Sequence, residues 1–312
     1  MREAQAGATL AAVLRELLPG TSWSKARDLC RDGRARVNGE PEADSARRLE
    51  AGDRVEVGAP ARGAQDRPAS SRPTTGELIV HLDAEVAVVR KPAGVLTVPF
   101  TGDEKDTLLS LARVAVRRLD AARGVDHGPS LRVVQRLDKE TSGLVVFART
   151  VAAQRRLQEQ LGEHTVTRRY LAIVHGEARD AIYDTFLVPD RGDGLRGSWG
   201  AFRAPRGTPP AQGRQAVTHV RVKERLRGST LVTCELETGR QHQIRIHLAE
   251  AGFPLVGEAV YIRDYEGPRI AAPRPMLHAA VLGFVHPRTG KPVQLEDPPP
   301  VDFDAVLARL RR

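Results

Sequence analysis

Two carboxylates that could do chemistry lie in the stretch VVQRLDKETSGLVVFART, residues 133–150. Asp138 and Glu140 separate two apolar runs and are flanked by the cations Arg136 and Lys139. Adjacent cations favour an ionised carboxylate, which suits a nucleophile or base better than a proton donor. An aspartate in a strand-connecting turn explains this stretch at least as well, because the Thr-Ser-Gly that follows supplies turn geometry. The rest of the chain must decide between these two explanations.

Sequence signatures of common cofactor sites are missing. The chain has no G-x-x-x-x-G-K-[ST] loop, no G-x-G-x-x-G after a strand, no H-E-x-x-H and no G-x-S-x-G. Its nine histidines lack metal-ligand spacing. Cys30 and Cys234 lie far apart in apolar settings, form neither a disulfide framework nor a zinc motif, and have no evident base nearby. We therefore expect no cofactor and no metal.

The charge of the chain points to a polyanionic partner. Of its 312 residues, 48 are Lys or Arg and 39 are Asp or Glu, giving net charge +9 and a pI near 10.1. The alternative is an Arg-rich genome with solvated surfaces, because 42 of the 48 cations are Arg. No window approaches a membrane span, and the amino terminus resembles a helix start rather than a signal peptide. We expect a reduced, cytoplasmic protein, and a monomer.

A change in composition divides the chain. Residues 59–76 are rich in Pro, Ala, Ser and Gly and contain no large apolar residue, so they cannot order themselves by burial. This predicts a flexible linker there, with one domain at 1–58 and a second at 77–312. The length of the chain accommodates two domains.

The amino-terminal segment predicts two helices followed by a small sheet. Apolar residues recur at helical spacing over residues 10–18, and a second helix enters through Ser22 or Ser24 and stops at Gly33. RARVNGE then predicts an Asn-Gly hairpin, and LEAGDRVEV another turn and strand.

A basic patch extends from the second of these helices into the hairpin. Between residues 25 and 36, five cations outnumber the two anions, although residues 1–58 are neutral overall; these cations are Lys25, Arg27, Arg31, Arg34 and Arg36. Such a patch is typical of phosphate contact, and the alternative is a helix whose exposed side is merely charged. The segment resembles the small RNA-binding fold named after a small-subunit ribosomal protein, the S-four fold.

The second domain is expected to be rich in strands. ELIVHL and EVAVVRKPAG predict a hairpin, and YLAIVHG, AVTHVRV, TLVTCEL and MLHAAVLGFVHP predict further strands. Helices are expected near 106–119, 150–162 and 241–250. Because strands and helices do not alternate regularly, we expect an α+β domain with a mixed, mainly antiparallel sheet rather than a doubly wound one.

Five motifs in order along residues 77–300 closely resemble the RluA family of RNA pseudouridine synthases. They are AVVRKPAGVLTVPF, QRLDKETSGLVVFART, RRYLAIVHG, ELETGRQHQIRIHLAEAGFPLVGEAVY and LHAAVLGFVHPRTGKP. The second and fourth are long and specific. The basic module before them matches the arrangement in family members that act on ribosomal RNA.

The resemblance implies roles for four residues. Asp138 matches the catalytic aspartate, and Arg136 matches an arginine that holds the target nucleotide out of the stack. Tyr170 matches a tyrosine whose ring lies against the flipped base. Arg245 matches the arginine that pairs with the catalytic carboxylate. The simpler alternatives are that Tyr170 is a core residue of its strand and that Arg245 is an exposed helix cation.

Other positions of the fourth motif are assigned to structure or RNA positioning rather than chemistry; they are Arg240, His242 and Gln243. The chain departs from the family pattern at two places. Gln135 stands where the family often has His, which we interpret as altered packing or RNA contact. Gln241 replaces the usual Thr, which could change how the helix start is capped.

The chemistry implied by the resemblance needs no cofactor. Converting uridine to pseudouridine breaks an N–C bond and makes a C–C bond without net redox change, so one carboxylate, one cation and one aromatic face suffice. An enzyme that acts on a base must also extrude it from the stack. We expect an RNA pseudouridine synthase acting on ribosomal rather than transfer RNA. A non-enzymatic RNA-binding or assembly factor and, less favoured, an N-glycosidase using Asp138 and Glu140 are the alternatives.

Overall fold

The computed structural model describes residues 6–312, except 22, 32, 43, 46, 59–74, 100–105, 126–129, 193–194 and 202–207. The chain forms two compact units. The first contains residues 1–71 and 189–206, and the second contains residues 72–188 and 207–312. The predicted linker, 59–76, lies mostly outside the described residues, apart from two positions at the start of a short helix. The domain limits drawn from the sequence stay a prediction.

The first unit contains two helices and a three-stranded sheet in the order β2-β1-β3. Its elements are α1 (Leu10–Leu17), α2 (Trp23–Arg31), β1 (Ala35–Val37), β2 (Glu40–Pro41), β3 (Val55–Val57) and, from the later segment, β10 (Gly197–Ser198). Asn38 and Gly39 both have positive φ, as an Asn-Gly hairpin turn requires. Gly33, with φ of +66°, follows the end of α2. Leu10, Leu14 and Leu49 are buried where the helices meet the sheet.

The second unit is built on one large sheet. Its strands are β4 (Ile79–Leu82), β5 (Val86–Lys91), β6 (Arg132–Val133), β7 (Ser142–Ala148), β8 (Thr167–His175), β9 (Ala181–Val188), β11 (Arg214–Leu226), β12 (Ser229–Leu236), β13 (Leu277–Val285) and β14 (Pro292–Glu296). They run in the order β9-β11-β12-β8-β13-β7-β5-β4, with β14 paired to β13 and β6 to β7. The β13–β7 pairing is parallel and the other pairings within this unit are antiparallel. A mixed, mainly antiparallel sheet was the sequence prediction, and it is confirmed.

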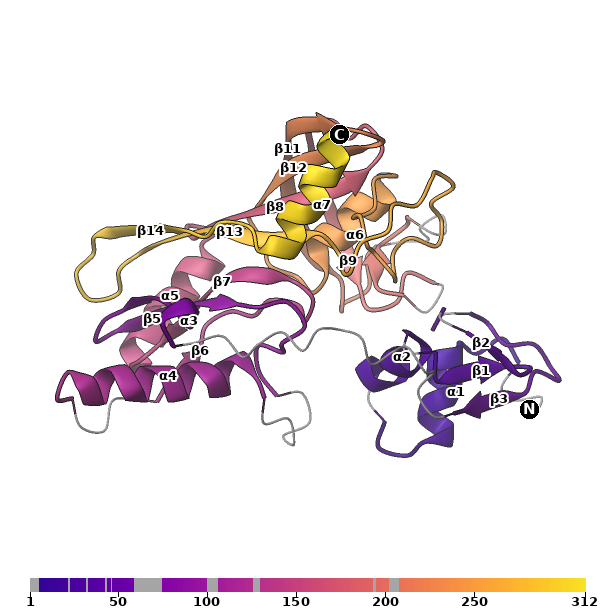
Figure 1. Cartoon of the computed structure of the whole chain (residues 1–312), viewed down its shortest axis with the longest axis horizontal. Helices are drawn as coiled ribbons and strands as arrows, with labels where there is room; N and C mark the ends of the chain where they lie inside the picture. The colour runs from indigo at the N-terminus through magenta and orange to yellow at the C-terminus, as the bar shows by residue number, and fades with distance from the viewer. Residues whose placement is uncertain are drawn as a thin grey trace. The chain divides into compact units, whose positions relative to one another are not determined.

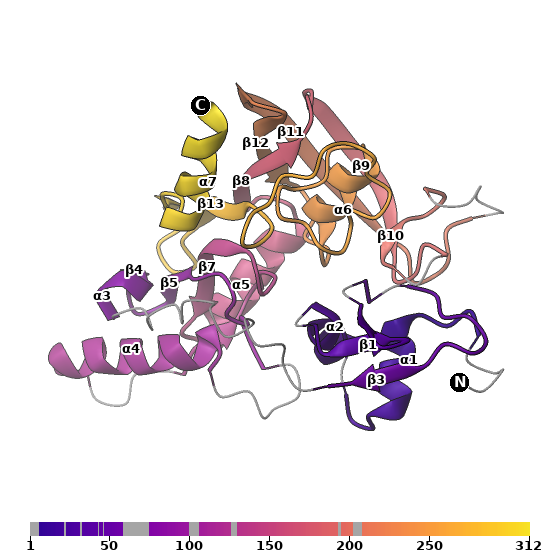
Figure 2. The same cartoon turned by 45° about the vertical axis from the view of Figure 1, so that its right-hand side comes forward.

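Helices cover both faces of this sheet (Figure 1). They are α3 (Thr75–Leu78), α4 (Leu108–Ala122), α5 (Val151–Gly162), α6 (Gln243–Glu250) and α7 (Val301–Arg311). Around β5 and β7, α4 packs on the side chains of one face and α5 on those of the other. Around β8 and β12, α6 packs on one face of the sheet and α7 packs on the other. Figure 1 shows α4 beside β6, Figure 2 shows α4 beside β4, and both show α7 beside β8 and β13.

The alternation along β8 shows why the two faces differ. Ala172 and Val174 point into the cluster that contains α6, whereas Ile173 points into the cluster that contains α7. Four elements of this unit, α3, β9, β14 and α7, were not predicted from the sequence, and α3 includes the first two residues of the strand expected at ELIVHL. No helix among the described residues is long and apolar enough to cross a membrane.

Candidate active site

The segment between β6 and β7 carries Asp138, and a buried lysine binds its backbone. Lys91, at the end of β5, is fully buried, and its ammonium donates to the carbonyls of Lys139 and Thr141, both at 2.8 Å, and of Pro92 at 3.0 Å. Burial lowers the pKa of Lys91 to about 7, although the nearby charges of Asp138 and Glu140 oppose the shift. The backbone on the carboxyl side of Asp138 is therefore anchored to the central part of the sheet.

The other side of the segment is anchored through Leu137. The Thr97 hydroxyl lies 2.9 Å from the Leu137 carbonyl and 3.2 Å from its amide nitrogen. The Leu137 side chain packs against both the cluster that contains α4 and the cluster that contains α6. The backbone on the amino side of Asp138 is therefore fixed where these two clusters meet.

A close approach of two strands follows directly after this segment. Gly143 of β7 pairs with Ala279 of β13, and a Cβ at Gly143 would lie 2.3 Å from the Ala279 carbonyl oxygen. Its φ of +114° also disfavours any residue with a side chain. Only glycine allows β7 to pair with β13 in this register, so Gly143 fixes the position of the Asp138 segment relative to the middle of the sheet.

Arg245 reaches the Asp138 carboxylate from α6. Its Nη1 atom lies 4.0 Å from Asp138 Oδ2, and the guanidinium is buried, with 9% of its side chain exposed. The prediction paired these two residues, and the structure brings them together at a distance longer than a hydrogen bond. The alternative of an exposed helix cation is wrong, because α6 buries six consecutive residues, Gln243–Leu248.

Glu258 fixes the rest of the Arg245 guanidinium. Arg245 donates from Nε to Glu258 Oε2 at 2.8 Å and from Nη2 to Glu258 Oε1 at 2.7 Å. Burial alone would raise the pKa of Glu258, but the Arg245 charge and the hydrogen bonds outweigh it and lower the pKa to about 2. Burial likewise opposes the charge on Arg245, and the same pair more than offsets it and raises the Arg245 pKa. With two of its nitrogens engaged in this way, Nη1 is the atom that faces Asp138.

The backbone around Glu258 completes this arrangement. Glu258 Oε1 also accepts from the amides of Ala259, Val260 and Tyr261, at 3.0, 2.8 and 3.3 Å. The preceding Gly257 approaches the Arg274 carbonyl so closely that a Cβ would lie 2.0 Å from the oxygen. The carboxylate is therefore held by the loop that carries it, and in turn holds Arg245.

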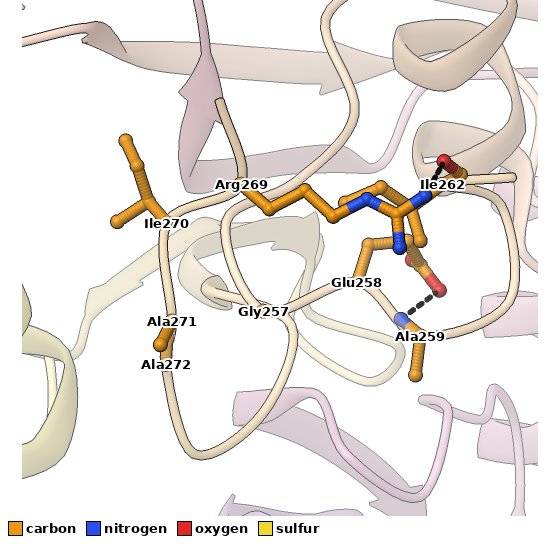
Figure 3. A pocket seen from close by; sticks show the side chains of 8 residues that line it. All are labelled: Gly257, Glu258, Ala259, Ile262, Arg269, Ile270, Ala271 and Ala272. Carbon is orange, nitrogen blue, oxygen red and sulfur yellow. Dashed lines mark hydrogen bonds between the residues drawn. The ribbon is translucent and has the colours of Figure 1, made fainter. Parts of the chain in front are cut away.

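The same loop lines a pocket of about 330 Å³ (Figure 3). Its lining residues are Gly257, Glu258, Ala259, Ile262, Arg269, Ile270, Ala271 and Ala272. The polar side chains in the lining have partners, since Glu258 binds Arg245 and Arg269 Nη2 donates to the Ile262 carbonyl at 3.4 Å. The pocket is thus bounded mainly by backbone and small apolar side chains.

His242 is a second group beside Asp138. Its Nε2 atom lies 3.9 Å from Asp138 Oδ1, and its Nδ1 forms a 2.7 Å hydrogen bond with the Tyr261 hydroxyl. The residue precedes α6 with left-handed backbone angles, φ 59° and ψ 15°. The sequence assigned His242 to structure or RNA positioning, and its proximity to Asp138 could not be read from the spacing.

The remaining predicted site residues differ in their surroundings. Tyr170, on β8, is 8% exposed within the cluster that contains α6, so part of its ring belongs to the core. Burial raises the pKa of Tyr170 to about 12, and the nearby Asp138 charge acts in the same direction. Arg136 is exposed, two residues before Asp138. The structure thus brings Asp138, Tyr170 and Arg245 together and leaves Arg136 at the surface.

The neighbouring motif positions Gln243 and Arg240 differ in their surroundings. The Gln243 amide donates to the Val217 carbonyl at 2.9 Å and accepts from the Thr238 hydroxyl at 2.8 Å, all within the core. Arg240 is exposed and donates to the Gln215 carbonyl at 2.9 Å. Gln241 is exposed and Gln135 is half-buried, so neither departure from the family pattern disturbs the core. Within the described part of the chain, no cluster of three or more His, Cys, Asp or Glu could hold a metal ion.

The predicted RNA-binding residues lie in the first unit. Lys25 is exposed, and Arg27, Arg34 and Arg36 are half-buried. Arg34 Nε donates to the Gly58 carbonyl and Arg36 Nη1 to the Gly39 carbonyl, at 3.2 and 3.3 Å. The Arg31 side chain lies outside the described residues.

Comparison with known proteins decides the family. The RNA pseudouridylate synthase family matches residues 85–250, more than half of the chain, and the S4 domain matches residues 9–55. The chain belongs to the RNA pseudouridylate synthase family. The predicted class, an isomerase that converts uridine to pseudouridine in RNA, is confirmed, as is the RNA-binding module before it. The non-enzymatic factor and the N-glycosidase are not supported.

Individual relatives agree along nearly the whole chain. The Bacillus subtilis (strain 168) protein named Uncharacterized RNA pseudouridine synthase YlyB is 38% identical over 93% of this chain and 90% of its own length. The Xanthomonas campestris protein named Ribosomal large subunit pseudouridine synthase D is 34% identical over 99% of this chain and 91% of its own. Among solved structures, human RNA Pseudouridylate Synthase Domain Containing 4 matches with a TM-score of 0.62 at 22% identity. That match covers 76% of this chain and 94% of the human chain, and shows the fold.

Proposed function

We propose that this pseudouridine synthase modifies uridines in ribosomal RNA of the large subunit, with Asp138 as the catalytic carboxylate. One observation carries the assignment of Asp138. A buried guanidinium, fixed on two nitrogens by Glu258, presents its third nitrogen 4.0 Å from the Asp138 carboxylate. A fixed cation at this distance attracts the half-buried carboxylate and orients it for reaction.

The carboxylate acts at the junction of base and sugar, where the N1–C1′ bond breaks and the C5–C1′ bond forms. Arg245 orients the Asp138 carboxylate, and the Tyr170 ring provides the apolar surface on which the detached uracil turns. Arg136, exposed beside Asp138, holds the extruded nucleotide by its phosphate or takes its place in the stack. These groups together need no cofactor, because the reaction is an isomerisation.

The first unit anchors the RNA through its basic residues. Phosphates of the RNA bind five basic side chains, which gives affinity without recognition of the base sequence. These are Lys25, Arg27, Arg31, Arg34 and Arg36. A large-subunit ribosomal RNA target is supported by relatives that bear that name and match almost the whole chain. We place the enzyme in the cytoplasm, where such RNA is accessible. We expect it to act as a monomer.

Pseudouridine mapping of total RNA tests the target and the residue together. Cells lacking the gene are compared with cells that carry the wild-type gene or the Asp138→Asn variant. We expect one or more large-subunit positions to lose pseudouridine without the gene, to regain it with wild type, and to stay unmodified with the variant. Lost positions confined to transfer RNA would refute the proposed target, and restoration by Asp138→Asn would refute the proposed residue.

A further inference from the structure

His242 lies in a backbone conformation that a histidine adopts at a cost. Its φ of 59° is in the left-handed region, which non-glycine residues enter rarely and which often marks functional sites. The side chain makes no capping hydrogen bond to α6. Instead the imidazole lies edge-on to the Tyr261 ring at 5.6 Å, with Nδ1 bonded to the Tyr261 hydroxyl. The conformation therefore serves the placement of the ring rather than the start of the helix.

The Nε2 atom faces the place where the reaction must occur. It lies 3.9 Å from Asp138 Oδ1, and 15% of the side chain is exposed. If Asp138 reacts at the junction of base and sugar, then N1, C5 and C1′ must each come into contact with its carboxylate. A nitrogen 3.9 Å from that carboxylate is within reach of the same atoms, directly or through one water molecule.

The reaction also requires a group that moves a proton. When C5 of the detached uracil bonds to C1′, C5 still carries its hydrogen and N1 has none. The C5–H bond must then break, with its electron pair staying in the ring, and N1 must gain a proton. The net change moves one proton from C5 to N1, without oxidation or reduction, so one group that accepts and returns a proton suffices.

Tyr170, Lys91 and Arg245 do not suit this task. Burial raises the pKa of Tyr170 to about 12, so its hydroxyl stays protonated near neutral pH. Lys91 is fully buried and donates to three carbonyls. Arg245 stays charged and is held by Glu258. An imidazole exchanges protons near neutral pH and is the side chain most often used for such transfers.

We propose that His242 is a second catalytic residue, which takes the proton from C5 and returns it to N1. This inference rests on the proposed role of Asp138. The proposal requires the tautomer in which Nδ1–H donates to the Tyr261 hydroxyl across this 2.7 Å hydrogen bond, so that Nε2 is the basic nitrogen facing the substrate. The Asp138 carboxylate lies beside the imidazole, and the guanidinium carbon of Arg245 lies 5.2 Å from the centre of the ring of Tyr261, the hydrogen-bond partner of His242. The Asp138 carboxylate stabilises the imidazolium while it holds the proton.

An isotope experiment tests this role. The full-length protein is given RNA with deuterium or hydrogen at C5 of the target uridine, and kcat is measured for wild type and His242→Asn. Asparagine tolerates the left-handed conformation, so the backbone is preserved. We expect kcat to fall roughly 10²-fold with unchanged KM, and the deuterium isotope effect on kcat to rise well above the wild-type value, because loss of the C5 proton becomes rate-limiting.

Two further variants keep the test decisive. Tyr261→Phe removes the partner of Nδ1, and we expect a smaller fall in kcat with a raised isotope effect. His219→Asn changes a histidine on β11 that binds Glu237, and should leave both quantities unchanged. An isotope effect that stays at the wild-type value in both His242→Asn and Tyr261→Phe overturns the proposal, whatever happens to kcat. Isomerisation by Asp138→Asn would instead refute the role of Asp138, so the two failures are distinguishable.

Discussion

The change Glu258→Gln tests whether a buried carboxylate positions Arg245 for the reaction. Glu258 is buried and accepts two hydrogen bonds from Arg245 and three from backbone amides, all on carboxylate oxygens. Glutamine keeps the shape of the side chain but removes its negative charge. Its NH2 group also replaces one acceptor oxygen, so it faces either an Arg245 nitrogen or the backbone amides, which are themselves donors. Leaving a buried charge without its partner costs about 3–5 kcal/mol of stability.

The pKa of Glu258 gives a second measure of the same interaction. Its fall from 4.5 to about 2 on folding corresponds to roughly 3 kcal/mol. Because the folded-state pKa is the lower one, this stability is fully present above about pH 4.5 and is lost as the pH falls through about 2. The difference in unfolding free energy between wild type and Glu258→Gln should therefore shrink over that window. At neutral pH, displacement of Arg245 should lower kcat roughly 10²-fold.

Urea unfolding and single-turnover kinetics on the same samples measure both effects. Glu85→Gln is the matched control, since Glu85 is also buried and binds Arg288 and the Thr150 hydroxyl, on another part of the second unit. The control should lose stability but keep its rate per folded molecule. Equal rates for Glu258→Gln and Glu85→Gln would refute the positioning role of Glu258.

Three further changes have defined outcomes. Tyr170→Phe should retain more activity than Tyr170→Ala, because the ring face is kept; equal losses in a kinetic assay would instead point to the hydroxyl. Gly143→Ala should lower the midpoint of thermal unfolding, because its Cβ would lie 2.3 Å from the Ala279 carbonyl oxygen, and an unchanged midpoint would disprove that contact. Replacing Lys25 and Arg27 by Gln should weaken RNA binding at every sequence and reduce the salt slope by about 1.4–1.8; an unaltered slope in a binding titration would remove these two residues from the RNA contact.

Much of the fold was predictable because its signals are local. The Asn-Gly turn at residues 38–39 and the alternating strand at 167–175 follow from neighbouring residues alone. The strand β9 was missed because its sequence, AIYDTFLV, does not alternate apolar and polar residues: exposure alternates along the strand, but apolar residues such as Ile182 and Phe186 occupy exposed positions. The parallel pairing of β7 with β13 joins segments more than a hundred residues apart, and no local pattern specifies it.

The site was predictable only as far as motif resemblance reached. Asp138, Tyr170 and Arg245 were assigned from such motifs, and the structure brings the three together. Glu258 was overlooked, although one carboxylate within the apolar run GFPLVGEAVY was a signal of a buried, paired charge. The position of His242 beside Asp138 depends on a left-handed turn before α6, which residue spacing does not reveal.

The most direct test of the central claim is single-turnover isomerisation of the mapped RNA by wild type and Asp138→Asn, with RNA affinity measured on the same samples. Asparagine preserves the shape of the side chain but can neither attack nor accept a proton. The account predicts that Asp138→Asn binds the RNA as tightly as wild type and forms no pseudouridine. Pseudouridine formation at the wild-type rate by this variant would contradict it.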